Sequence, residues 1–264
     1  MADSAKNSLE SYPRYLVPGF TPFDPLDLSR QTEQIVCDGS RRKYTKFSCP
    51  RMYGGIATGY ACGCCLRCIF CWVHRSRDFP EKHGYFKSPE EVFGELSWMA
   101  RRKKVDQLRI SGAEPTLGKA HLLGLLDLVE RSPFRLFILE TNGILLGADS
   151  GYAREIACFK KVHTRVALKA GTPGAFTRKT GAKPEFFELP FQGIRNLLSA
   201  RMSYHVAAIS ADPRFMTKQE RNSLFEQLEA IHPALVKNLE EEIVTPYPTA
   251  SERLRHACVD VDWG

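Results

Sequence analysis

The stretch Tyr60–Trp72, YACGCCLRCIFCW, places five cysteines within ten consecutive positions. A hydrophobic core does not require sulfur at this density, so we expect these cysteines to act together on a metal or in catalysis. The five are Cys62, Cys64, Cys65, Cys68 and Cys71.

Two spacings overlap in this stretch. The run Cys62-x2-Cys65-x2-Cys68-x2-Cys71 approaches the bacterial ferredoxin pattern, but that pattern ends in x3-Cys-Pro, which is not the case here. A zinc site would normally add a second Cys-x2-Cys pair about 15 residues away, and that pair is missing. The spacing Cys64-x3-Cys68-x2-Cys71 instead offers three thiolates, which can hold three corners of a [4Fe–4S] cluster and leave the fourth iron open.

The composition is that of an ordinary globular chain. The protein has 264 residues, of which 43% are hydrophobic and 25% are charged. The sequence contains neither a secretory signal pattern nor an apolar run close to the roughly 20 residues of a membrane span. We therefore expect a cytoplasmic protein without a membrane partner, in which thiols are kept reduced and cysteines serve metal binding or catalysis.

Positive charge suggests a nucleic-acid partner as one interpretation. The formal net charge is +7, and cations cluster at Arg41–Lys46 and Arg101–Lys104. The second cluster falls at the expected end of a helix, where cations complement the helix dipole and face water. On charge alone we favour this local interpretation.

Hydrophobic periodicity predicts strands that alternate with helices after the cysteine stretch. Such alternation is typical of parallel strands joined by right-handed helical crossovers. The expected strands are 54–61, 105–112, 134–143, 162–171, 204–210 and 240–248, and the expected helices are 88–104, 119–132, 151–161, 190–201 and 217–231. Capping boxes are expected at the start of two of these helices, at Ser88 with Glu91 and at Thr217 with Glu220. The sequence thus predicts an α/β fold, an incomplete (β/α)6 TIM-like barrel.

Three domains or segments are expected. Residues 1–55 are rich in proline, serine and charge, which predicts an N-terminal extension, an extended arm wrapped on the barrel. Residues 56–247 form the core barrel, and residues 248–264 form a short C-terminal cap or tail that returns over it.

The cysteine motif resembles the signature of the radical S-adenosylmethionine (SAM) enzymes. It is Cys-x3-Cys-x-aromatic-Cys, with Phe70 as the aromatic residue, and it follows the first expected strand, on the side where β/α-barrel sites are built. Three further motifs follow in the order of that family, each at a strand end: SGAEPTL (111–117), ETNG (140–143) and VALKAGTPGAFTRKTG (166–181). The last resembles the subgroup of pyruvate formate-lyase activating enzyme and 7-carboxy-7-deazaguanine synthase.

The resemblance implies a [4Fe–4S] cluster and SAM as cofactors. Cys64, Cys68 and Cys71 would bind the cluster, whose open iron would be chelated by SAM. Glu114 would accept a hydrogen bond from the SAM ammonium. The remaining implied cofactor contacts are Gly112, Ala113 and Pro115 of the same loop, Asn142 and Lys169 at neighbouring strand ends, Phe70 over the cluster and Trp72 beside the adenine.

Some positions depart from the family. Ala113 replaces the second glycine of the Gly-Gly-Glu-Pro loop, while Glu140 and Ala167 stand where the activating enzymes have aspartate. A monovalent-cation site and a close equivalence with those enzymes are therefore in doubt. The other cysteines, Cys37, Cys49, Cys62 and Cys65, could be bystanders, alternate ligands or a second metal site.

The implied activity is reductive cleavage of SAM to a 5′-deoxyadenosyl radical that abstracts hydrogen from a substrate. Activation of a glycyl-radical enzyme and modification of an RNA base or a small metabolite both remain open, so the substrate could be protein or RNA. The expected electron donor is a low-potential protein such as flavodoxin or ferredoxin. From another class, the chain could be an iron–sulfur electron carrier that does not turn over SAM, although the Gly112–Pro115 loop would then have no purpose.

Overall fold

Six parallel strands form the centre of the sheet in the computed structural model, which describes residues 11–264. Within these residues the first and last of the six, β3 and β9, do not pair with each other, so the barrel is not closed. The predicted α/β fold, an incomplete (β/α)6 barrel, is confirmed. The strands are β3 (Ala57–Ala61), β5 (Gln107–Gly112), β6 (Leu136–Thr141), β7 (Val162–Leu168), β8 (Ser203–Ala208) and β9 (Glu240–Glu241), in that order across the sheet.

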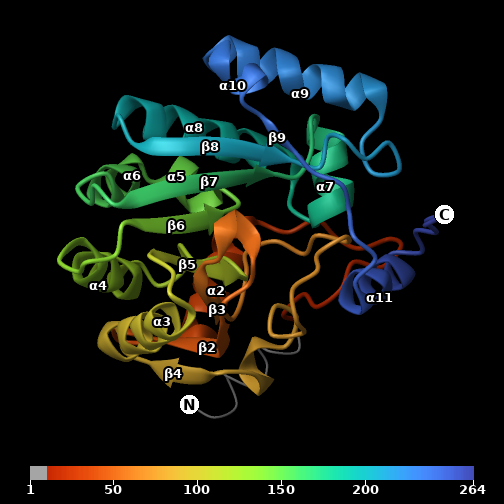
Figure 1. The fold of residues 1–264 in the computed structure, drawn as a ribbon. Helices are drawn as coiled ribbons and strands as arrows, with labels where there is room; N and C mark the ends of the chain where they lie inside the picture. Colours follow the sequence, from red (N-terminus) through yellow and green to blue (C-terminus); the bar gives the residue numbers. More distant parts are fainter. Residues whose placement is uncertain (1–10) are drawn as a thin grey trace.

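Helices cover the outside of the sheet, with α3, α4, α6 and α8 beside the strands that they connect (Figure 1). All five predicted helices are present: α3 (Pro89–Lys103), α4 (Lys119–Glu130), α6 (Ser150–Ile156), α8 (Glu188–Ser199) and α9 (Lys218–Ile231). The sequence patterns do not predict α2 (Pro25–Val36), α5 (Ile144–Ala148), α7 (Pro173–Thr180), α10 (Ala234–Lys237) and α11 (Pro248–His256). Most of these helices are short, and a helical period is hard to recognise over so few residues.

Helix-start signals locate two of the helices. Ser88 and Glu91 form a reciprocal capping box, as predicted, and Pro89 begins α3. Thr217 caps α9 by accepting from the Glu220 backbone, but the Glu220 side chain bonds Lys179 and the Gly171 backbone instead. That second capping box is only half formed, because a tertiary ion pair takes its carboxylate.

The N-terminal segment is more structured than an extended arm, which corrects that expectation. Helix α2 begins at the Asp24 cap, and β2 (Arg41–Ser48) pairs antiparallel with β3. Strands β1 (Cys37–Asp38) and β4 (Tyr85–Lys87) pair with β2, so the sheet continues beyond the parallel strands. The boundary at 55/56 stays a prediction, and the part of the predicted arm at 1–10 lies outside the described residues.

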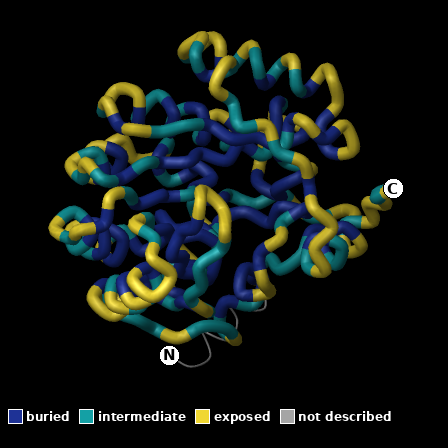
Figure 2. The backbone as a smooth tube through the Cα atoms, viewed as in Figure 1, coloured by how far each residue is buried: buried dark blue, intermediate teal, exposed yellow. Residues whose placement is uncertain are grey.

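Burial follows the layers of the fold. The strands are largely buried, while the outward sides of the helices are exposed (Figure 2). Because the six central strands are parallel, their carboxyl ends lie at one edge, and the loops that follow β3, β5, β6 and β7 meet there. Among residues 11–264, no helix combines the length and apolar character needed to cross a membrane.

Candidate active site

Only some of the five clustered cysteines line the main cavity of the fold. Cys64, Cys68 and Cys71 line a cavity of about 390 Å³, whereas Cys62 and Cys65 do not line it. The thiol of Cys62 approaches the His83 carbonyl at 3.8 Å. The loop that carries the three lining cysteines follows β3, so their common position is a consequence of the fold.

The loop after β5 forms another wall of the same cavity. Gly112, Ala113 and Glu114 line it, while Pro115 is buried outside the lining. Gly112 has φ +95°, and a Cβ there would lie 3.2 Å from the Ala61 carbonyl oxygen. Glycine is therefore required at 112 by conformation and by space. Ala113 does not have a positive φ, which explains why its methyl group is tolerated.

Protein donors occupy most of the acceptor positions of the Glu114 carboxylate. Its Oε1 accepts from the Thr116 backbone at 3.1 Å, from the Thr116 hydroxyl at 2.6 Å and from the Thr141 hydroxyl at 2.7 Å. Its Oε2 accepts from the Asn142 backbone at 2.8 Å, and the residue is only 2% exposed. Since a carboxylate offers about four acceptor positions, Glu114 chiefly joins the loops after β5 and β6.

Asn142 faces the cysteines. Its Nδ2 lies 3.3 Å from the Cys65 sulfur and 3.7 Å from the Cys64 sulfur, while its Oδ1 caps the Ile144 backbone. The neighbouring Cys65 thiol stabilises the Cys64 thiolate and lowers the pKa of Cys64, and this effect outweighs the opposing effect of burial. The side chain expected beside SAM is thus in contact with a predicted cluster ligand and its neighbour.

Lys169 lines the cavity beyond the end of β7. Burial raises the pKa of the Cys68 thiol to about 12, and the Lys169 ammonium is the largest influence that opposes this rise. The described residues include no carboxylate in an ion pair with Lys169. Its charge is therefore available to an anionic group in the cavity.

The two aromatic residues of the motif occupy different depths. Phe70 is 6% exposed and packs edge-on against Phe215, with ring centroids 5.7 Å apart. Trp72 is 46% exposed and contacts Tyr60 and Tyr247 at the rim. Both line the cavity, Phe70 from within and Trp72 from its edge.

A family model of the radical SAM superfamily matches residues 60–221, which is more than half of the chain. The chain belongs to the radical SAM superfamily. A search of curated protein sequences finds no significant match.

Solved structures agree on the fold. A mutant of spore photoproduct lyase with bound AdoMet and dinucleoside spore photoproduct superimposes with a TM-score of 0.55 at 13% identity, covering 94% of this chain and 74% of that chain. Native anSMEcpe with bound AdoMet superimposes with a TM-score of 0.52 at 15% identity, covering 69% of this chain and 49% of that chain. The radical SAM chain therefore spans about half the length of that second relative.

A buried ion network lies behind the cysteine loop, and no sequence pattern predicted it. Asp78 pairs with both Arg77 and Arg253, and all three side chains are nearly inaccessible. Arg77 also donates to the Cys68 carbonyl at 2.7 Å, and Arg253 of α11 donates to the Cys71 carbonyl. The backbones of two of the three lining cysteines are thus held by arginines that share one buried carboxylate.

Two further arginines, Arg109 and Arg165, line the cysteine cavity. Arg109 pairs with Glu140 at 2.9 Å, and Ser111 donates to the other oxygen of that carboxylate at 2.6 Å. Arg165 pairs with Glu240 at 2.8 Å and with Glu242 at 2.7 Å. The Glu140 carboxylate is therefore engaged by protein partners, in agreement with the doubt about a monovalent-cation site.

The donor set fits the iron–sulfur cofactor of the superfamily. The lining thiols come from one loop and share their cavity with the Lys169 ammonium and the glycine-dependent loop after β5, which suits a cluster with SAM. Among residues 11–264, no three His, Cys, Asp or Glu side chains are arranged around a single ion, and a cluster separates its ligands farther than one ion does. At the level of the family, the predicted cofactors SAM and [4Fe–4S] are supported.

Proposed function

We propose that this chain cleaves SAM reductively and uses the resulting radical to abstract hydrogen from a substrate bound in the same cavity. The observation that carries the proposal is the convergence of Cys64, Cys68 and Cys71 with the Gly112–Glu114 loop, Asn142 and Lys169 on that cavity. These residues come from four segments that are far apart in sequence. Each segment follows one of the four neighbouring strands β3, β5, β6 and β7.

The three thiolates would hold the cluster. A bound and reduced cluster would supply the one electron needed for reductive cleavage of the sulfonium C–S bond of SAM, with methionine and a 5′-deoxyadenosyl radical as products. The protein's part is to bind and orient. Lys169 supplies a positive charge for the SAM carboxylate, and Gly112 allows the positive φ with which the loop after β5 packs against Ala61 and lines the cavity.

Glu114 acts in this scheme mainly as a positioning residue. Because its oxygens accept from Thr116, Thr141 and the Asn142 backbone, it fixes the two loops against which SAM would lie. Its Oε2 accepts one bond from the protein and retains room for a second, which the SAM ammonium could donate.

The cavity also bears on the electron-carrier alternative. An electron carrier has no need of a cavity of about 390 Å³ lined by an unpaired lysine and a glycine-dependent loop. As a radical SAM enzyme the chain needs an external reductant, and flavodoxin or ferredoxin would provide a suitably low potential.

The test is anaerobic reconstitution of the full chain and of the triple variant Cys64→Ala/Cys68→Ala/Cys71→Ala. The matched control is Cys158→Ala/Cys258→Ala, since both of these cysteines are exposed and lie outside the cavity. Iron and sulfide are counted, and 5′-deoxyadenosine is assayed after addition of SAM and dithionite.

We expect about four irons per chain and 5′-deoxyadenosine in the wild type and the control, and neither in the triple variant. Iron without 5′-deoxyadenosine would favour the electron carrier. Zinc in protein purified without air would refute the proposal. Iron retained in the triple variant would point to a second cluster that uses Cys37, Cys49, Cys62 or Cys65.

A further inference from the structure

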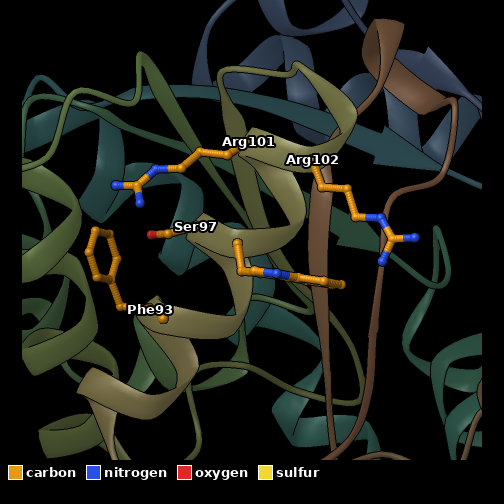
Figure 3. Close-up of a pocket in the computed structure, with 6 residues that line it drawn as sticks. Phe93, Ser97, Arg101 and Arg102 are labelled. Carbon is orange, nitrogen blue, oxygen red and sulfur yellow. The ribbon is translucent and has the colours of Figure 1, made fainter.

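A second hollow lies on the outer side of α3, near the end of that helix. It measures about 600 Å³ and shares no lining residue with the cysteine cavity. Figure 3 shows the side chains that surround it. The lining residues are Phe93, Gly94, Ser97, Trp98, Arg101 and Arg102.

The cations at this hollow have no carboxylate partners. Arg101, Arg102, Lys103 and Lys104 are consecutive and exposed, and none of them forms an ion pair within residues 11–264. Of the arginines at other helix ends, Arg131 pairs with Asp127, while Arg154, Arg178 and Arg255 are also without an ion pair among the described residues. The end of α3 differs from these in that it places four cations in succession. The helix dipole amounts to about half an elementary charge at the C-terminus, so it neutralises only a small part of four cations. The surplus of positive charge is therefore available to an anionic ligand.

An exposed indole lies beside these charges. Trp98 is 54% exposed, and the Arg102 guanidinium carbon lies 5.1 Å from the centroid of its ring. Exposure of an indole to water is unfavourable, while its flat face suits stacking with a base. In Figure 3 Arg101 and Arg102 leave the helix in different directions, so the two guanidinium groups reach separate places along the surface.

The Ser97 hydroxyl gives a second, independent indication that this hollow binds a polar ligand. The residue is 5% exposed, and its hydroxyl has no hydrogen-bond partner among the described residues. Figure 3 shows this hydroxyl directed toward the space between Phe93 and Arg101. A buried hydroxyl without a partner is costly, and an acceptor oxygen of a ligand would satisfy it.

We infer that the outer face of α3 binds single-stranded nucleic acid. Trp98 stacks on a base, Arg101 and Arg102 contact successive phosphates, and Ser97 donates to a phosphate oxygen. The combination of adjacent cations with an exposed aromatic ring is the arrangement by which strands are held without sequence readout. An acidic polypeptide would satisfy the charges but would not need the indole face. This binding does not depend on the proposed reaction, because the two sites share no residue.

Fluorescence anisotropy with a labelled single-stranded RNA of about 12 nucleotides tests the inference on the full chain. Trp98→Ala should weaken binding about tenfold, while Trp98→Phe keeps a ring and most of the affinity. Arg101→Gln/Arg102→Gln should reduce the slope of log K against log salt by about 0.7 for each phosphate that is no longer neutralised. The matched control, Arg30→Gln/Arg131→Gln, removes the same charge from exposed arginines elsewhere and should change affinity little.

Three results would overturn the inference. They are the absence of saturable binding at low salt, equal losses in the control and in the α3 variants, and displacement of the RNA by polyglutamate as effectively as by unlabelled RNA. Formation of 5′-deoxyadenosine should be unchanged in every α3 variant. A failure at this surface is thereby distinguished from a failure of the proposed reaction.

Discussion

Replacement of Asp78 by asparagine should destabilise the protein strongly, because two buried arginines depend on its charge. Asp78 is fully buried, and the side chains of Arg77 and Arg253 that pair with it are each 2% exposed. Burial opposes ionisation of Asp78, but the charges and hydrogen bonds of both arginines outweigh burial and lower its pKa. Asparagine keeps the shape and leaves two buried cations without a counter-charge.

The expected loss is about 3–5 kcal/mol in the free energy of unfolding, the range for removing one partner from a buried ion pair. For a chain of this size that is a fall of about 10 °C in Tm. Because the pKa of Asp78 is lowered on folding, its contribution to the free energy of unfolding depends on pH. The contribution is complete above the unfolded pKa and is lost as the pH falls through the folded pKa.

Urea unfolding of the apoprotein measures the loss, and cluster content after reconstitution measures the effect on the cysteine loop. Asp127→Asn is the matched control, because it removes the same group from an exposed pair and should cost less than about 1 kcal/mol. A loss below about 1 kcal/mol for Asp78→Asn would show that the two guanidinium groups reach water or other acceptors. The buried network would then not be a support of the cysteine loop.

Three further results are expected. Glu114→Gln turns an amide toward the Asn142 N–H and should cost about 1.5–3 kcal/mol in urea unfolding, whereas a neutral effect would contradict its role in joining the loops. Gly112→Ala places a methyl group 3.2 Å from the Ala61 oxygen at positive φ, and should weaken SAM binding in anaerobic equilibrium dialysis; unchanged affinity would show that the loop can shift. Burial lowers the pKa of His121 to about 4. The free energy of unfolding should therefore be highest above the unfolded pKa near 6.5 and fall by about 1.4 kcal/mol per pH unit between there and pH 4, because only the unfolded chain takes up the proton. Urea unfolding of His121→Gln as a function of pH should lack this slope.

The sequence predicted the features that local pattern encodes. The strands β5 and β6 coincide with runs of apolar residues, and α3 begins at a capping box. Their presence and order could therefore be predicted from the sequence. The cysteine spacing offered Cys64, Cys68 and Cys71 as one of two overlapping sets, and the resemblance to the family selected that set. These three cysteines line the cavity, whereas Cys62 and Cys65 do not.

What the sequence did not reveal depends on contacts between distant segments. Arg253 bonds the Cys71 carbonyl across 182 positions and Asp78 across 175, and no local periodicity encodes such a pairing. The Glu220 carboxylate was expected at a helix cap but bonds Lys179, because a buried ammonium binds it more strongly than a backbone N–H does. Tertiary contacts of this kind can be found only once the fold places the residues side by side.

The network around Asp78 also changes how the C-terminal segment is understood. Residues 248–264 were expected to be a tail over the barrel, yet α11 contributes Arg253, which reaches both Asp78 and the backbone of Cys71. A side chain that is nearly inaccessible and satisfies a buried charge is part of the core, however late it occurs in the chain. The position of Cys71 therefore depends on α11 as well as on the loop after β3. The cysteine motif supplies the thiols, and the rest of the chain determines where they are held.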